Sequence, residues 1–335
     1  MMSSIRRSAI VAAVSLSVLV SVPVGAQTAP LASWNDGPTK QAILNFVRAT
    51  TDRSSQQFVQ PDERIATFDN DGTLWVEQPL YTQGIFALER VGALAEDHPE
   101  WKTTEPFKSV LERDEAAMAK FTEADWEKIV AATHSGMTVE AFNEIAAKWL
   151  ATATDKRFKR HYTELVYQPM LELLSYLRAN GYKTYIVTGG GQDFVRAFAP
   201  KVYGVALEQV VGTAGKTKLE YAQNGQAELV KAPEILYVDD KTGKPEGIHL
   251  VIGRRPWGAF GNSDGDMQML QWTQAGGGPR LMMLVHHDDA QREYAYGARS
   301  KVGTFSDSLM SVAKKGGWTV ISIRNDWRRV FPFDP

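Results

Sequence analysis

The chain has 335 residues, of which 44% are hydrophobic and 23% charged, a composition that excludes an intrinsically disordered protein and predicts a large buried core. The formal net charge is −2 and the chain has no long block of Lys and Arg residues, so no nucleic-acid-binding face is expected. Because cysteine is absent, disulfides, thiolate metal sites and a lipid-modified N-terminal cysteine are excluded.

The first residues differ in character from the rest of the chain. Arg6 and Arg7 precede an uncharged stretch at residues 8–22, which is followed by small residues at 24–26. This pattern predicts a secretory signal peptide at residues 1–26. A membrane anchor is the alternative, but the stretch is shorter than the roughly 20 residues that span a bilayer. We therefore expect an exported protein, periplasmic or secreted, that has no membrane association once the signal is cleaved.

Five short apolar runs have the length and composition of buried strands. They lie at residues 65–68, 184–187, 258–260, 281–285 and 319–323. Helical segments lie between them, including residues 170–179 before the second strand and 267–273 after the third. The alternation predicts an α/β fold, a Rossmann-like parallel sheet with helices on both faces. In such a sheet, ligands bind beyond the carboxyl ends of the strands.

Residues 79–162 interrupt this alternation, because they contain helical patterns alone. Thr138 is a candidate N-cap followed by apolar residues at helical spacing, and Thr122 begins another segment with a variant of the capping box. A helical insertion after the first strand predicts a cap over the carboxyl edge of the sheet, although helices packed into one core are the alternative. We expect an α/β core at residues 27–78 and 163–335 and a helical cap at residues 79–162.

A second insertion lies at residues 213–238. Alternating residues flank Asn224-Gly225, which is the strongest short signal for a hairpin turn. We expect a small β excursion from the core at this point.

Polar and glycine-rich loops follow the first three predicted strands. They read Asp69-Asn70-Asp71-Gly72-Thr73, Thr188-Gly189-Gly190-Gly191 and Gly261-Asn262-Ser263-Asp264-Gly265-Asp266. The hydroxyl and bare main-chain N–H groups of the second loop predict an anion site. Acidic groups beside an anion call for a divalent cation, and hard oxygen ligands favour Mg²⁺ over zinc. An EF-hand calcium loop is excluded, because Leu74 and Met267 stand where its glycine is required.

These loops, with a lysine between the second and the third, resemble the four ordered motifs of the haloacid dehalogenase superfamily, specifically its phosphoserine-phosphatase-like phosphatases. The resemblance covers residues 65–270, and the helical insertion falls where such enzymes carry their cap. It implies a hydrolase that removes phosphate from a small phosphorylated substrate through an aspartyl-phosphate, with Mg²⁺ as its cofactor.

The resemblance also implies a role for individual residues. Asp69 would be the nucleophile and a metal ligand. Asp71 would protonate the departing alkoxide and then activate water, with its main-chain carbonyl on the metal. Dehalogenases of the superfamily lack this second acid because a halide needs no proton, so Asp71 argues for phosphate. The residues implied in substrate binding are Thr73, Thr188, Gly189 and Gly190.

The lysine of the third motif has three candidates. Lys244 precedes a helical segment at an interval from the last loop that is close to the family's usual one, and we predict it as the catalytic lysine. Lys231 and Lys241 are rivals in the same loop-rich region.

The last motif departs from the common pattern of the family. Most relatives have Gly-Asp followed four residues later by Asp, whereas this chain has Gly261-Asn262 and then Asp266, with Asp264 between them. Asn262 can offer a neutral carbonyl ligand, or Asp264 can take over the metal. We expect the metal ligands to come from Asp69, Asp71, Asn262, Asp264 and Asp266.

The sequence therefore predicts an exported, Mg²⁺-dependent phosphatase for a small phosphomonoester. A phosphotransferase or mutase of the same superfamily is one alternative. A non-catalytic protein that binds a phosphorylated ligand is another, although binding alone needs no nucleophile and acid pair.

Overall fold

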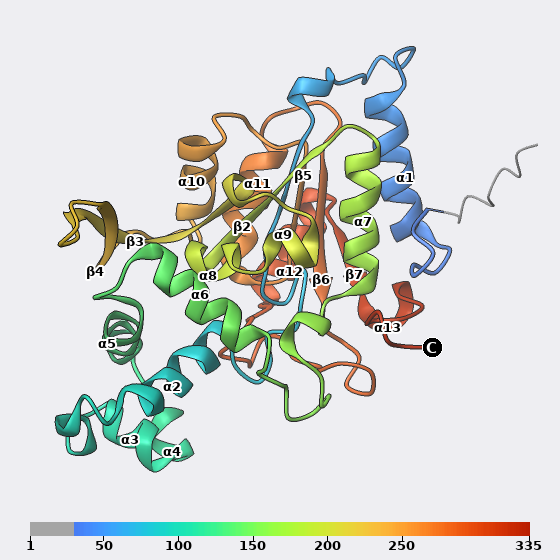
Figure 1. Cartoon of the computed structure of the whole chain (residues 1–335). Coiled ribbons are helices and arrows are strands. Elements are labelled where there is room, and N and C mark those ends of the chain that lie inside the picture. Colours follow the sequence, from blue (N-terminus) through green and yellow to red (C-terminus); the bar gives the residue numbers. More distant parts are fainter. Residues whose placement is uncertain (1–29) are drawn as a thin grey trace, which may run out of the picture.

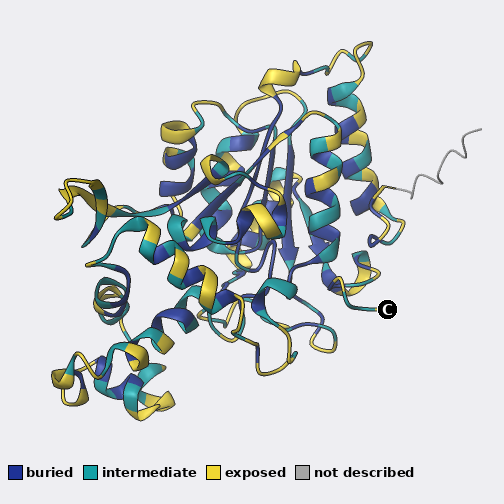
Figure 2. Ribbon diagram, in the orientation of Figure 1, coloured by how far each residue is buried: buried dark blue, intermediate teal, exposed yellow. Residues whose placement is uncertain are grey.

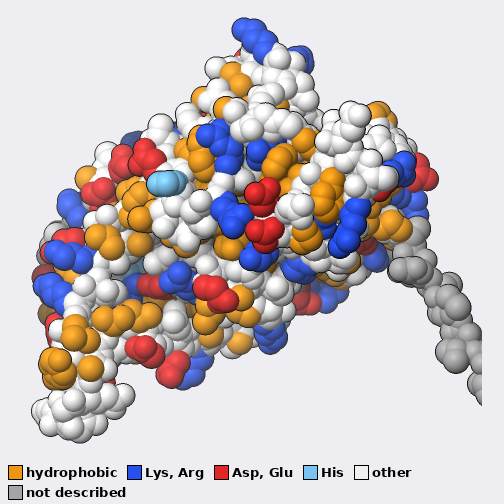
Figure 3. Space-filling view, turned by 90° about the horizontal axis from the view of Figure 1, so that it is seen from above, with side chains coloured by type: hydrophobic (Ala, Val, Ile, Leu, Met, Phe, Trp, Pro, Cys, Tyr) orange, Lys and Arg blue, Asp and Glu red, His pale blue; other side chains and the backbone are white. Residues whose placement is uncertain are grey.

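The computed structural model describes residues 30–335 (Figure 1). The predicted signal peptide at residues 1–26 lies outside the described residues. Within the described part, no helix combines the length and the apolar character needed to cross a bilayer. On the face shown in Figure 3, Lys and Arg side chains are interspersed with Asp and Glu.

A seven-stranded sheet forms the centre of the protein, in the order β4-β3-β2-β1-β5-β6-β7. The strands are β1 (Ile65–Phe68), β2 (Lys183–Gly191), β3 (Val210–Tyr221), β4 (Ala227–Tyr237), β5 (Gly258–Gly261), β6 (Leu281–His286) and β7 (Thr319–Ser322). Neighbouring strands are parallel except β3 and β4, which are antiparallel. The central strands are buried (Figure 2). This arrangement confirms the predicted α/β fold.

Helices cover both faces of the sheet and create two apolar clusters. One face is covered by α1 (Pro38–Thr51) and α7 (Gln168–Ala179), and the other by α10 (Gly243–Val251), α11 (Met267–Gln274) and α12 (Asp307–Gly316). Consecutive strand residues alternate between the clusters, because successive side chains of a strand point to opposite faces. Ile186 and Phe260 belong to the first cluster, and Val187 and Ala259 to the second. Covered faces explain why the strands read as continuous apolar runs.

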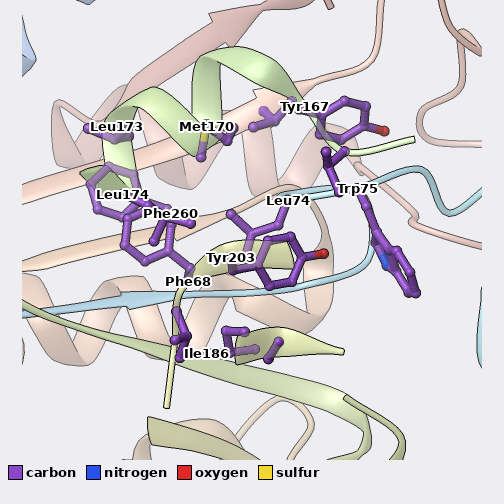
Figure 4. Close-up of a cluster of buried hydrophobic side chains, with 14 of the residues drawn as sticks. Phe68, Leu74, Trp75, Tyr167, Met170, Leu173, Leu174, Ile186, Tyr203 and Phe260 are labelled. Carbon is purple, nitrogen blue, oxygen red and sulfur yellow. The ribbon is translucent and has the colours of Figure 1, made fainter. Parts of the chain in front are cut away.

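The first cluster fixes the end of β1, from which the first acidic loop departs. Figure 4 shows Phe68 of β1 against Phe260 of β5, with the two rings stacked and their centroids 4.3 Å apart. Burying a side chain of this size stabilises the fold by roughly 1.5–3 kcal/mol. Three short helices complete the core: α8 (Gln192–Arg196) and α9 (Ala199–Tyr203) after β2, and α13 (Ile323–Asp326) after β7.

The segment between β1 and β2 is helical, as predicted. It contains α2 (Thr82–Leu94), α3 (Phe107–Glu112), α4 (Glu115–Met118), α5 (Glu123–His134) and α6 (Val139–Leu150). Thr138 caps α6 by accepting a hydrogen bond from the Ala141 N–H, and Thr122 forms the predicted capping box at α5. Part of the insertion has its own small apolar cluster, which includes Trp101 and Ile129. In Figure 1, α2 to α5 extend away from the sheet at its lower edge.

The predicted β excursion is the hairpin of β3 and β4, with Asn224 and Gly225 in its turn. Gly225 has a positive φ of 82°, which that turn requires and which glycine adopts without strain. The hairpin is less separate from the core than expected, because the start of β3 pairs with β2 before the strand leaves the sheet. Its second strand supports the helical insertion, since main-chain hydrogen bonds join Lys231 to Gly136 and Met137.

Candidate active site

The loop after β1 holds the two aspartates in a tight turn at the carboxyl edge of the sheet. The Asp69 N–H donates to the Phe260 carbonyl at 2.9 Å, which continues the pairing of β1 with β5. Gly72 follows with a φ of 78°, and a Cβ there would lie only 2.2 Å from Asn262 Nδ2. The turn therefore requires glycine, and it brings the first acidic loop against the last one.

Asp71 is held apart from Asp69 by its own partners. The Trp75 indole N–H donates to Asp71 Oδ1 at 2.9 Å, and Asn70 Nδ2 donates to Asp71 Oδ2 at 3.3 Å. Burial raises the pKa of Asp71, and the hydrogen bond from Trp75 opposes this rise. The two aspartates consequently have different surroundings.

Lys244 joins the first acidic loop to the last. Its Nζ lies 2.5 Å from Asp69 Oδ1 and 2.6 Å from Asp266 Oδ1, and it donates to the Val187 carbonyl at 3.0 Å. Only 2% of Lys244 is exposed. Burial acts to lower the pKa of Lys244, but Asp266 and Asp69 outweigh it and raise this pKa above its ordinary value. The ammonium group is therefore a fixed positive charge beside Asp69.

The start of α10 explains why Lys244 reaches this position. Gly243 is the first residue of that helix, and a Cβ there would lie 2.1 Å from the Val238 carbonyl oxygen. The two rival lysines lie elsewhere: Lys231 pairs with Asp193, and Lys241 is exposed.

The loop after β5 brings Asn262 and Asp266 to the same place. Asp266 Oδ2 accepts from the main-chain N–H groups of Asn262 and Ser263, at 2.9 and 3.0 Å. Asn262 Oδ1 accepts from the Thr73 hydroxyl at 3.0 Å. Thr73, which was expected to contact substrate, is thus fully buried and uses its hydroxyl to hold Asn262.

Asp264 lies differently from the other acidic residues of its loop. Its Oδ1 accepts from the Ser306 N–H at 3.0 Å, and its own N–H donates to the Thr304 carbonyl. The 3-10 helix at residues 264–266 starts at Asp264 and gives it a different direction from Asp266. Of the two, Asp266 is the one that the structure joins to Asp69 through Lys244.

The glycine-rich loop after β2 faces Asp71. Thr188 Oγ1 accepts from the Gly190 N–H at 3.0 Å, and a Cβ on Gly190 would lie 3.7 Å from Asp71 Oδ2. A Cβ on Gly189 would meet Asp240 at 3.7 Å. The Gly190 N–H is thus used within the loop, and the Thr188 hydroxyl hydrogen and the main chain at Gly189 are the groups that can donate to an anion beside the two aspartates.

A side chain of the helical insertion binds this glycine-rich loop. Gln83 of α2 accepts from the Gly191 N–H at 2.7 Å, and its Nε2 lies 3.2 Å from His134 Nε2. Burial lowers the pKa of His134 to about 3, so its ring is neutral at ordinary pH and can accept this hydrogen bond. The hydrogen-bonded chain connects α5 and α2 to the edge of the sheet where the aspartates lie.

The electrostatics of the site favour a cation. Asp69, Asp266 and Glu77 are all buried, and Lys244 bridges only the first two. Burial raises the pKa of Asp69 well above its ordinary value, and the charge of Asp266 raises it further against the effect of Lys244. Burial likewise raises the pKa of Glu77 well above its usual range. These carboxylates ionise at a cost that a bound divalent cation would offset.

The oxygen atoms at this site, from a carboxylate, a main-chain carbonyl and a side-chain amide, are ligands that Mg²⁺ accepts. Within residues 30–335, no three His, Asp or Glu side chains are arranged around one metal position. A cation here would thus combine the Asp69 carboxylate with neutral oxygens, the Asp71 main-chain carbonyl and the Asn262 amide. Mg²⁺ accepts such oxygen donors and keeps several waters.

The sequence analysis missed several residues that contact the site, among them Trp75, which donates to Asp71, and the three that follow. Glu77 contacts Asn262, and Gln83 contacts Gly191. Asp239 is completely buried beside α10, the helix that contains Lys244. Burial raises the pKa of Asp239 to about 7, and the charge of Lys244 opposes this rise. Only Glu77 carried a usable signal, since it is a charged residue in the otherwise uncharged stretch from residue 72 to residue 86.

Residues 66–271 match the family model of the haloacid dehalogenase-like hydrolases. The chain belongs to this family. The match contains the three loops described above and Lys244, so the haloacid dehalogenase-like hydrolase region coincides with the candidate site.

Three solved structures are similar to this chain, and the one whose TM-score exceeds 0.5 agrees with this fold. A conserved protein of unknown function from Anaerococcus prevotii is 16% identical, with 86% of this chain and 93% of that chain covered and a TM-score of 0.55. A protein of unknown function from Bordetella pertussis is also 16% identical, over 77% of this chain and 98% of that one, with a TM-score of 0.47. A probable phosphoserine phosphatase from Vibrio cholerae is 13% identical over 79% of this chain and 62% of that chain, with a TM-score of 0.40. No curated protein matches this haloacid dehalogenase-like hydrolase.

Proposed function

We propose that the protein is a Mg²⁺-dependent phosphatase that hydrolyses a small phosphomonoester through an aspartyl-phosphate, in the phosphoserine-phosphatase-like branch of its family. One observation carries the proposal: Lys244 binds Asp69 at 2.5 Å while Asp71 stands two residues away in different surroundings. A nucleophile beside a fixed cation and a separate acid are what displacement at phosphorus needs.

The first chemical step forms a bond between Asp69 and phosphorus. Lys244 donates to Oδ1 of Asp69 at 2.5 Å and holds the carboxylate in place while one of its oxygens attacks. As the new O–P bond forms, the ester O–P bond breaks, and Asp71 gives its proton to the departing alkoxide. Burial raises the pKa of Asp71, so this residue holds a proton more readily than an exposed aspartate does.

The second step returns the enzyme to its starting state. Asp71, now ionised, takes a proton from a water molecule as the water oxygen attacks the phosphorus of the aspartyl-phosphate. The bond between phosphorus and Asp69 breaks, and inorganic phosphate leaves. We expect the Thr188 hydroxyl, the main-chain N–H of Gly189 and Lys244 to stabilise charge on the phosphoryl oxygens in both steps, while the Gly190 N–H holds Thr188 Oγ1.

A bound Mg²⁺ supplies further positive charge to the phosphoryl oxygens, and Asp69, the Asp71 carbonyl and Asn262 are the groups that would hold it. Asp266 supports this set from behind, because its oxygens are taken by Lys244 and by two main-chain N–H groups. We take residues 79–162 as the cap that closes the pocket, since Gln83 already reaches the glycine-rich loop.

A panel of phosphomonoesters tests the activity. With Mg²⁺ present, we expect the purified protein to release inorganic phosphate from at least one small monoester, and we expect EDTA to abolish the release and added Mg²⁺ to restore it. Phosphate release that EDTA leaves unchanged would contradict the metal dependence. Transfer of the phosphoryl group to a second substrate without hydrolysis would instead show a phosphotransferase, and no turnover on a broad panel would contradict catalysis.

We propose also that the protein is exported, on the pattern of its first 26 residues. We expect a tagged full-length chain, expressed in a bacterial host, to appear outside the cytoplasm with Gln27 as its first residue. Cell fractionation and N-terminal sequencing measure this directly. A full-length, uncleaved chain in the cytoplasm would contradict export and leave the proposed chemistry untouched.

A further inference from the structure

Glu77 is a buried carboxylate whose contacts lead into the candidate site. Only 2% of the residue is exposed. Its Oε1 accepts from Asn262 Nδ2 at 2.6 Å and from the Tyr296 hydroxyl at 2.7 Å. Both hydrogen bonds thus come from residues far away in the sequence.

The Glu77 carboxylate fits into its position because two neighbouring residues are glycines without side chains. A Cβ on Gly72 would lie 2.3 Å from Glu77 Oε1, and a Cβ on Gly303 would lie 1.8 Å from the same atom. Both glycines have positive φ, 78° and 62°. Because any other residue at either position would collide with the carboxylate, the chain is built around Glu77 on two sides.

Glu77 and Thr73 together fix the orientation of the Asn262 amide. Asn262 Nδ2 donates to Glu77 Oε1 at 2.6 Å, so the NH₂ group of Asn262 faces Glu77. The Thr73 hydroxyl donates to Asn262 Oδ1 at 3.0 Å, which occupies one of the two lone pairs of that oxygen. The other lone pair remains for a cation.

The charge of the site depends on Glu77 as well. Asn262 is a neutral ligand, and the nearby Asp266 shares the single charge of Lys244 with Asp69, at 2.6 and 2.5 Å. Glu77 forms no ion pair with a Lys or Arg within the described residues, and both of its partners are neutral donors. A cation bound at Asn262 would favour the ionised form of Glu77, whose charge, one amide away from the metal position, is not offset by a Lys or Arg partner.

We propose that Glu77 is a positioning residue of the metal site, which orients the Asn262 amide oxygen toward Mg²⁺ and supplies the negative charge that Asn262 lacks. This inference rests on the proposed Mg²⁺-dependent function. Residues that hold a metal ligand in this way change metal affinity by about 10- to 100-fold when they are replaced.

The test is a calorimetric Mg²⁺ titration of the full chain without substrate. Glu77→Gln keeps the shape of the side chain and an oxygen that can accept from Asn262, but it removes the charge. We expect its dissociation constant for Mg²⁺ to rise by about 10- to 100-fold. Glu172→Gln is the matched control, because Glu172 is a half-buried carboxylate that binds Ser33 on the outside of α7. We expect this control to bind Mg²⁺ as the wild type does.

A charge exchange separates the proposed role from a purely structural one. In the double variant Asn262→Asp with Glu77→Gln, the charge moves to position 262 and the contact between the two side chains is kept. We expect the double variant to recover most of the lost affinity, and circular dichroism without metal checks that each variant is folded. Equal binding by wild type and Glu77→Gln overturns the inference, as does a double variant that binds no better than Glu77→Gln. If Glu77→Gln does not fold, the Mg²⁺ affinity of the double variant is compared with that of the wild type: a similar affinity supports the inference, and a loss of about 10-fold or more overturns it. A wild-type chain that binds no Mg²⁺ would overturn the metal dependence of the proposed function itself.

Discussion

Replacing Asp69 by Asn is expected to lower kcat by about 10⁴-fold or more. The amide cannot attack phosphorus, and the carboxylate oxygen that Lys244 holds at 2.5 Å is replaced by a neutral group. The measurement is steady-state phosphate release, with the best monoester of the panel and saturating Mg²⁺.

The control for this variant is Asp36→Asn. Asp36 is an exposed aspartate that pairs with Lys40 on α1, outside the candidate site, so its replacement should leave kcat unchanged. Circular dichroism shows whether both variants are folded. A folded Asp69→Asn protein with substantial activity would show that Asp69 is not the nucleophile.

Replacing Lys244 by Met should have the largest effect on stability. The methyl thioether fits the buried space but leaves Asp69 and Asp266 without their cation. Breaking a buried ion pair from one side costs about 3–5 kcal/mol of unfolding free energy. We expect this loss in urea unfolding without metal, together with a large fall in kcat, because the phosphoryl oxygens lose a fixed positive charge.

Lys201→Met is the matched control for Lys244→Met. Lys201 is an exposed lysine of α9, and surface changes of this kind usually alter stability by less than about 0.5 kcal/mol. Added Mg²⁺ should recover part of the stability of Lys244→Met, since a cation near Asp69 offsets some of the missing charge. Unchanged unfolding free energy would contradict the burial and pairing described for this lysine.

The sheet and the loops of the site were predictable from the sequence because their signals are local. Five of the seven strands contain a short apolar run, four of these runs lead into glycine or polar residues, and parallel strands bring their carboxyl ends to one edge. For this reason the sequence alone predicts that Thr188 and Asn262 lie near Asp69. The hairpin was also recognised from Asn224 and Gly225, although its first strand begins earlier, at Val210, where it still pairs with β2.

The direction of individual side chains was not predictable in the same way. Asp264 and Asp266 are two residues apart in one loop, and only the 3-10 turn decides that Asp264 binds Ser306 while Asp266 binds Lys244. The use of the Thr73 hydroxyl on Asn262 likewise depends on packing between two loops.

Contacts between distant segments account for the missed residues. The role proposed for Glu77 depends on its hydrogen bond with Asn262 and on the space beside Gly303. Gly303 belongs to a loop more than two hundred residues further along the chain. Gln83 joins the site only because α2 lies against the glycine-rich loop. No periodicity or motif reports such tertiary contacts.

The most direct test of the account is the chemical identification of the phosphorylated residue. Asp71→Asn should slow the second step, because water loses its base, while a substrate with a good leaving group, such as nitrophenyl phosphate, needs no acid in the first. The intermediate should then accumulate, and borohydride reduction converts an aspartyl-phosphate to homoserine. Peptide mass spectrometry is expected to find homoserine at position 69 only when substrate and Mg²⁺ are present. A burst of nitrophenol with an unmodified Asp69 peptide, or with the label on another residue, would contradict the proposed mechanism.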